Sequence, residues 1–215
     1  KRVMANIRTK TLRCAVCGQS SSQQVVLSRY VPDMGLDQKP KTAVLSFVLE
    51  CPHCHYAADD LEAPASEQTR AYVRSAEYQE WALRQQDAGL RRLEGAAKIA
   101  EHDRKWSEAS RRWLTAAWYC EENDLPAQAR ENRERAVQMV EAVPDLRLTP
   151  AQMLTYIDSL RQLRRFARAE QAAARNEAGF VQALGAEHLL TRILRAELAL
   201  AQKADAAPHL VSEVR

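Results

Sequence analysis

Four cysteines arranged as two CxxC pairs are the residues of this sequence best suited to chemistry. The pairs are Cys14 with Cys17 and Cys51 with Cys54, and the segment 18–50 separates them. Thiolates are soft, charged ligands, and four of them suit a tetrahedral zinc ion. Two residues between paired cysteines allow a tight turn that directs both sulfurs at one ion. The spacing therefore predicts a metal site made by all four cysteines.

A site of this kind closes the coordination of its metal. Four cysteines leave no position for water, so we expect a structural zinc ion and not a catalytic one. Iron in a rubredoxin-like site is the alternative, since four sulfurs accommodate either ion. Two disulfides are disfavoured because no secretory context is visible, and a redox pair normally begins a helix in a βαβ setting.

The other candidate reactive residues have no recognisable partners in the sequence. His53 and His55 flank Cys54, but four sulfurs already satisfy the ion, so we expect neither histidine to be a ligand. Cys120 falls on an apolar helical face, which predicts a buried thiol. The chain has no glycine-rich phosphate loop, no G-x-S-x-G and no H-E-x-x-H. We therefore expect a protein that is not an enzyme.

Composition and charge limit the classes of partner. The 215 residues are 46% hydrophobic and 27% charged, which is typical of a soluble globular protein. Uncharged, mostly apolar runs such as 43–49 are too short to cross a bilayer, so we expect no membrane association. Lys and Arg number 31 against 28 for Asp and Glu, a formal charge of +3. Four thiolates and one zinc ion would lower it to about +1. Any anionic partner must therefore be bound by local patches.

The two parts of the chain differ in composition. All four paired cysteines precede residue 63, whereas only five of the 36 alanines do. The early part contains two β-branched, alternating stretches, 25–31 and 42–49, and the second leads directly to Cys51. The later part is rich in alanine, the best helix former. The sequence therefore predicts an α+β fold that is mostly α: a small β-rich zinc ribbon over residues 1–62, followed by an antiparallel, TPR-like helical stack over residues 63–215.

Local signals divide the helical part. Helix starts are predicted at Ser66, at Asp124 followed by Pro126, and at Thr149 followed by Pro150 and Gln152. Stops or breaks are predicted at Gly89, Gly95, Pro144 and Pro208, and one more between Gly179 and Gly185. We expect six or seven helices with short connections, the first running from Ser66 to about Gln86. The last helix carries Glu197 on an otherwise apolar side.

Small and aromatic residues follow the spacing of tetratricopeptide helices. Trp113, Ala117, Ala129 and Ala136 lie at offsets like those of one repeat, and Met153 to Ala169 fit a second repeat more poorly. A generic helical bundle with alanine-rich interfaces is the alternative. In both cases the helix around Trp113 is apolar over much of its girth and should be buried.

Two segments and the helices that follow them resemble a bacterial family. The segments are Cys-Ala-Val-Cys-Gly and Cys-Pro-His-Cys-His-Tyr-Ala-Ala, and the family is the domain-of-unknown-function family 2225. The similarity covers most of the chain, and residues 51–58 are its specific part. It implies a CxxC ribbon followed by TPR-like helices in a bacterial cytoplasm, where thiolates stay reduced. Family members usually have Gly at the position of His55, and the family name supplies no function.

Two main functions fit these features. The first is a protein-binding scaffold, because helical repeats present surfaces for peptides or partner helices. The alternative is nucleic-acid binding, because zinc ribbons are often used in that way. The basic residues of the N-terminal arm are Lys1, Arg2, Arg8, Lys10 and Arg13. A second basic group is Arg161, Arg164, Arg165 and Arg168, which would form one stripe on a continuous helix, although a repeat places a turn near Arg164. A rubredoxin-like electron carrier is a third hypothesis. The sequence leaves the oligomeric state open.

Overall fold

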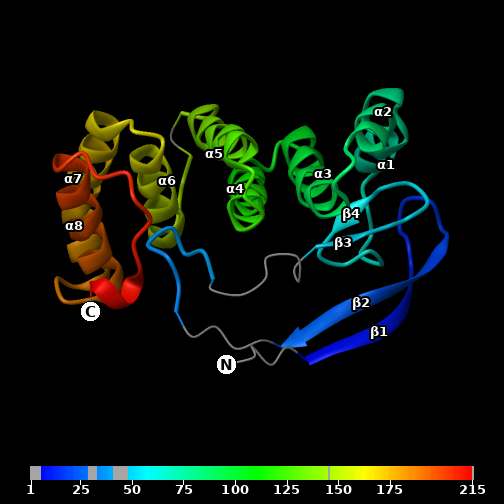
Figure 1. The fold of residues 1–215 in the computed structure, drawn as a ribbon, viewed down its shortest axis with the longest axis horizontal. Helices are drawn as coiled ribbons and strands as arrows, with labels where there is room; N and C mark the ends of the chain where they lie inside the picture. The colour runs from blue at the N-terminus through cyan, green and yellow to red at the C-terminus, as the bar shows by residue number, and fades with distance from the viewer. Residues whose placement is uncertain (1–5, 29–32, 41–47, 145, 215) are drawn as a thin grey trace. The chain divides into compact units, whose positions relative to one another are not determined.

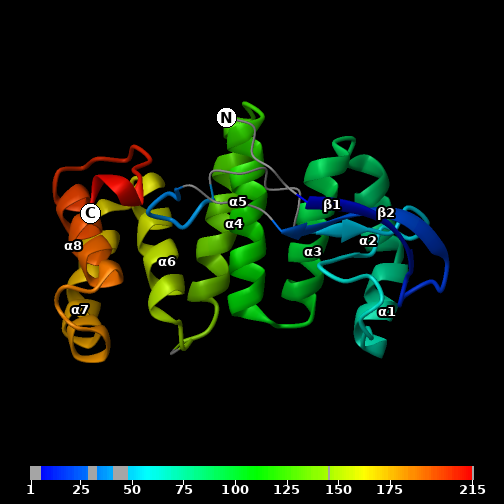
Figure 2. The same ribbon diagram turned by 90° about the horizontal axis from the view of Figure 1, so that it is seen from below.

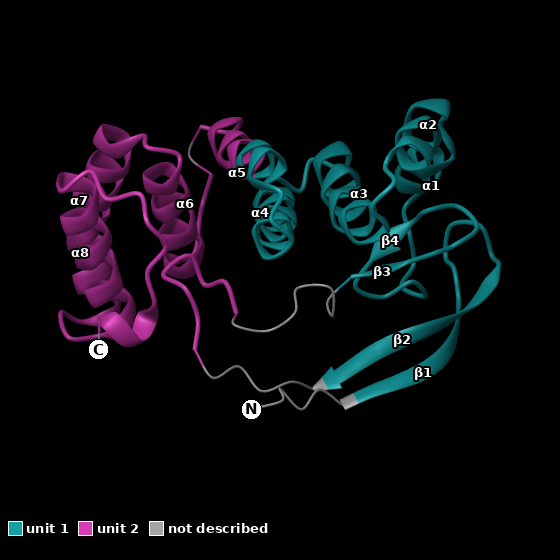
Figure 3. Cartoon of the chain, viewed as in Figure 1, with its two compact units in different colours: residues 1–30, 42–132 teal, residues 31–41, 133–215 magenta. Residues whose placement is uncertain are grey.

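The chain forms two compact units, seen here in a computed structural model that describes residues 6–28, 33–40, 48–144 and 146–214 (Figures 1 and 3). Unit 1 comprises Lys1–Tyr30 and Thr42–Asn132, and unit 2 comprises Val31–Lys41 and Arg133–Arg215. The domain boundary predicted between residues 62 and 63 lies inside unit 1, because the ribbon and the first helices share one core. The predicted two-domain division therefore stays a prediction.

Unit 1 combines two hairpins with four helices. The strands are β1 (Asn6–Arg13), β2 (Ser20–Ser28), β3 (Leu49–Glu50) and β4 (Ala57–Ala58), paired antiparallel as β1–β2 and β3–β4. The helices are α1 (Glu67–Arg74), α2 (Ala76–Arg84), α3 (Ala88–His102) and α4 (Trp106–Glu122), while α5 (Pro126–Glu141) is divided between the units. The stretch predicted at 25–31 overlaps the end of β2, and most of the stretch at 42–49 lies outside the described residues.

The first helical segment is interrupted where one helix was predicted. Ser75 has φ −65° and ψ 152°, ends α1, and accepts the Tyr78 amide as the N-cap of α2. The breaks expected at Gly89 and Gly95 do not occur, since both glycines lie within α3. Gly179 likewise lies inside a continuous helix, α7 (Phe166–Leu184), which ends at Gly185. A Cβ on Gly89 would lie 2.5 Å from the Tyr119 hydroxyl, so this glycine permits a close approach of α4. Helix α4 is buried over most of its length, as predicted.

Unit 2 is built on three helices that run side by side (Figures 1 and 2). They are α6 (Pro150–Gln162), α7 (Phe166–Leu184) and α8 (Leu189–Gln202), followed by a short 3-10 turn at Val211–Glu213. The predicted capping box of Thr149 and Gln152 is present. With eight α-helices among the described residues, one more than the upper expectation, the mostly-α α+β fold is confirmed. No described helix is long and apolar enough to cross a membrane.

Four helices end in the same turn. Helices α3, α4, α6 and α8 are followed by a non-glycine residue with φ between 53° and 60°, respectively Arg104, Asp124, Arg164 and Ala204. The next amide reaches back five residues, as from Lys105 to the Ala100 carbonyl at 2.9 Å and from Arg165 to the Leu160 carbonyl at 2.8 Å. Asp124, Arg164 and Ala204 are equally spaced along the chain, and Arg104 precedes Asp124 by half that interval. The turns thus mark a regular helical period.

An early segment of the chain, residues 33–40, belongs to unit 2. Leu36 is 1% exposed, lies in the core with α6 and α8, and donates its amide to the His209 carbonyl at 3.0 Å. The Gln38 side chain donates to the Ala151 carbonyl at 2.9 Å. This segment therefore packs in the core of unit 2 and is hydrogen-bonded to residues near its C-terminus.

A buried ionic network completes the core of unit 2. Arg161 is fully buried on α6, donates to Glu197 of α8 at 2.7 Å and to Asp158 at 2.5 Å, and also donates to two carbonyls of the C-terminal segment. Arg133 lies 3.6 Å from Asp37 and 3.8 Å from Asp158. The polar Glu197 on the apolar side of α8 is thus explained, because its partner is the buried Arg161.

The structure corrects the basic stripe considered for 161–168. Helix α6 ends at Gln162 and the chain turns at Arg164, so the four arginines do not share one helix. Arg161 is inside the core, and Arg168 pairs with Glu141. An anion-binding stripe is therefore absent at this position.

Replacing Glu197 with Gln should change how stability depends on pH. Burial, with the charge of Asp158, outweighs Arg161 and raises the pKa of Glu197 to about 9. When the pKa of a carboxyl group is higher in the folded chain than in the unfolded chain, its contribution to stability is complete at pH values below the unfolded pKa. That contribution is lost as the pH rises through the folded pKa. We expect the unfolding free energy to fall as pH rises from about 5 to about 9.

In Glu197→Gln this decline should flatten, as measured by denaturant unfolding followed by circular dichroism. Glu177→Gln removes a carboxylate from an exposed pair with Arg195 and should keep the wild-type decline. If Glu197→Gln kept the wild-type pH dependence of stability, titration of Glu197 would not be its cause.

Candidate metal centre

Each CxxC pair forms the turn of a hairpin. Cys14 to Cys17 connect β1 with β2, and Cys51 to Cys54 connect β3 with β4. In the first turn the Gly18 amide donates to the Cys14 carbonyl at 2.8 Å, and in the second the His55 amide donates to the Cys51 carbonyl at 2.9 Å. The two turns therefore have the same hydrogen-bonding pattern.

The residue after the second cysteine has positive φ in both turns. Gly18 has φ 76° and His55 has φ 59°. This conformation favours glycine and costs other residues about 1–2 kcal/mol. The His55 ring is held by Glu50 at 2.8 Å, and Glu50 also accepts from Arg91 at 2.8 Å. His55 is thus positioned by a carboxylate.

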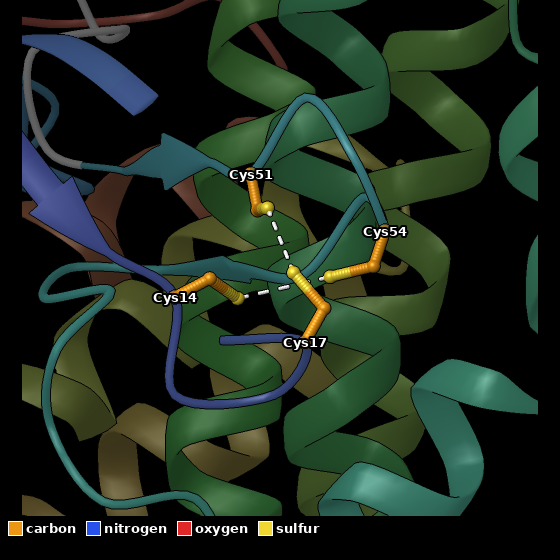
Figure 4. A group of neighbouring side chains, drawn as sticks. All are labelled: Cys14, Cys17, Cys51 and Cys54. Carbon is orange, nitrogen blue, oxygen red and sulfur yellow. Dashed lines mark hydrogen bonds between the residues drawn. The ribbon is translucent and has the colours of Figure 1, made fainter. Parts of the chain in front are cut away.

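The two turns bring four sulfur atoms together (Figure 4). The Sγ atoms of Cys14 and Cys54 are 3.7 Å apart, those of Cys17 and Cys51 are 3.6 Å apart, and all four lie within 4.8 Å of one another. A tetrahedral zinc ion with Zn–S bonds near 2.3 Å places its sulfurs about 3.8 Å apart. The distances exclude disulfides, whose S–S bond is about 2.05 Å. All four residues predicted as ligands therefore form one possible metal site.

Backbone amides and neighbouring thiols set the ionisation of the cluster. The Val16 amide donates to Cys14 Sγ at 3.4 Å. Burial raises the pKa of the Cys54 thiol, and the charges of Cys14 and Cys51 raise it further, against the amide of Tyr56. Burial also acts on Cys17, but amide and thiol hydrogen bonds outweigh it and lower its pKa. Four thiolates repel one another here, so a divalent cation would stabilise them.

The cluster lies inside the core of unit 1. Cys14 is 2% exposed and Cys51 is fully buried, and both pack with apolar side chains from the ribbon and the helices. The helix residues of this core are Val73, Tyr78 and Ile99. A metal bound here would be part of the packing that joins the ribbon to the helices.

Polar side chains from α1 and α2 hold the carbonyls of both turns. Arg74 donates to the Val16 carbonyl, Tyr78 to the His55 carbonyl at 2.8 Å, and Gln79 to the Cys54 carbonyl at 2.9 Å. Sequence reasoning missed these three residues, because no local spacing indicates contacts between positions so far apart in the chain.

The other candidate residues lie outside the cluster. His53 is exposed and His55 faces Glu50, so neither histidine is among the clustered donors. Cys120 is fully buried on α4, as predicted, and burial raises its pKa to about 11. Of the basic arm, Arg8, Lys10 and Arg13 lie on β1, while Lys1 and Arg2 are outside the described residues.

A search of protein-family models, curated proteins and solved structures finds no match to this chain.

Metal binding should require the paired cysteines and not the lone one. We expect the purified chain to bind one divalent ion, and Co(II) to give the absorption of a tetrahedral thiolate site. Cys51→Ser should weaken binding by more than the roughly 10–100-fold that loss of an outer-shell partner costs. The measurement is a competition titration against a chelator.

Cys120→Ser is the matched control, because Cys120 is also fully buried in unit 1 but is outside the sulfur cluster. It should keep wild-type affinity. Equal metal affinity in Cys51→Ser and the wild type would contradict the assignment of the ligands.

Proposed function

We propose that the protein is a non-enzymatic, protein-binding scaffold in which a structural zinc ion fixes a ribbon to a TPR-like helical domain. The observation that carries this proposal is the burial of four convergent sulfurs in the core that the ribbon shares with α1 to α3. Four sulfurs close the coordination of a zinc ion, which favours a structural role. The proposed partner is another protein or a peptide.

The regular helical turns support a repeat domain. The equal intervals from Asp124 to Arg164 and from Arg164 to Ala204 each correspond to one helical pair per repeat. Each interval is longer than a tetratricopeptide repeat, which has about 34 residues, so the likeness concerns the stacking of helical pairs and not the repeat length. Stacked helical pairs in other proteins present extended binding surfaces, which is the reason for proposing a protein partner.

The resemblance to family 2225 fits the geometry of the second turn. Family members usually have Gly where this chain has His55, and His55 has the positive φ that Gly adopts readily. Four free thiols in one cluster suit a reducing compartment. We therefore propose membership of this bacterial family and a cytoplasmic location.

Three measurements on the full chain separate the candidate functions. Metal analysis should find one zinc ion per chain; one iron with reversible one-electron reduction would instead indicate an electron carrier. Affinity capture from nuclease-treated host extract should recover one protein in stoichiometric amount.

The recovered protein should then bind the purified, zinc-loaded chain with a Kd of about 1 μM or tighter, measured by calorimetry. Cys120→Ser should bind equally well. Recovery of no stoichiometric protein, or of one that does not bind again when purified, would overturn the scaffold proposal.

A further inference from the structure

We propose that the β1–β2 hairpin binds the phosphate backbone of duplex nucleic acid through Arg8, Lys10 and Arg13. The charge of this part of the chain is strongly segregated. Residues 1–32 contain six Lys or Arg and no Asp or Glu, whereas the whole chain has 31 Lys or Arg and 28 Asp or Glu. Nucleic acid is the polyanion that such a surface complements.

The cations of the hairpin are available to a ligand. Arg8 and Lys10 are exposed and lie on the same face of β1, about 7 Å apart by strand geometry. Within the part of the chain that the structure describes, neither forms an ion pair. Arg13 is exposed beside the CxxC turn, where its Nε donates to the Gly18 carbonyl at 3.1 Å.

The shape and surface of the hairpin suit a groove. On the opposite face of the hairpin, which also carries Arg13, Thr9 and Thr11 and their cross-strand partners Gln24 and Ser22 are exposed and offer hydroxyl and amide donors to phosphate and sugar. A two-stranded β-ribbon fits the major groove of duplex DNA, which is about 12 Å wide.

The cysteine cluster fixes where the hairpin projects. Cys14 directly follows β1, and β2 begins at Ser20, so the CxxC turn is the turn of the hairpin itself. Leu12 is buried in the core of unit 1, and Val25, the cross-strand partner of Arg8, packs against that core, so the core contacts the hairpin from its CxxC turn to the level of Arg8. The cations are thus carried by a strand pair that the metal-binding core holds in place.

The salt dependence of binding tests this proposal. The zinc-loaded full chain is titrated into a fluorescent random-sequence DNA duplex, with single-stranded DNA and RNA of the same sequence as parallel probes. Three phosphate contacts give a slope of log K against log salt at least as steep as about −2.7, a loss of about 40-fold between about 50 and 200 mM salt. Arg8→Gln with Lys10→Gln should reduce the slope to about −0.9, a loss of about 3-fold over the same range, assuming one contact remains.

The matched control removes two exposed arginines of the same unit, Arg70→Gln with Arg84→Gln, and should keep the wild-type slope. Circular dichroism and zinc content should be unchanged in both variants. The proposal fails if no nucleic acid binds at low salt, if the two double variants behave alike, or if only vesicles rich in anionic lipid are bound. This hairpin is separate from the helices proposed to bind a protein, so either function can fail alone.

Discussion

The convergence of four thiols in an apolar core is the constraint on which unit 1 depends. Two hairpin turns with the same hydrogen-bonding pattern place these sulfurs within 4.8 Å of one another. At these distances ionised sulfurs repel one another, and burial adds to the free-energy cost of ionising them. A divalent cation reverses this balance, because each thiolate then becomes a ligand. The ribbon is small, so its fold would depend on this ion and on the helices that share its core.

Two side chains position His55 in the second turn of the ribbon. Glu50 holds the ring of His55, and Tyr78 from α2 holds its carbonyl. These contacts offset the unfavourable backbone conformation of a residue at a position where glycine is preferred. Unit 2 also buries carboxyl groups, and their partners there are arginines instead of a metal. Asp37 in that network comes from the segment that separates the two CxxC pairs in sequence.

Local patterns predicted the elements whose causes are local. The clustering of the four cysteines followed from the CxxC spacing, and the start of α6 followed from the capping box at Thr149. Three features depend on contacts between residues far apart in sequence and were not predictable in this way. They are the place of residues 33–40 in unit 2, the pairing of Arg161 with Glu197, and the hydrogen bond from Tyr78 to the second turn. Strand β1 was missed because its exposed cations obscure the alternation, and the break at Ser75 was missed because residues 66–86 contain no Gly or Pro, the usual break signals.

Amide hydrogen exchange with and without a chelator tests the central claim, that the metal joins the ribbon to the helices. Removal of the metal should abolish protection in both CxxC turns and reduce it in α1, α2 and α3, whose residues share that core. Protection in α6, α7 and α8 should not change, because these helices have a core of their own. Full protection of α1 to α3 in the metal-free chain would contradict the account.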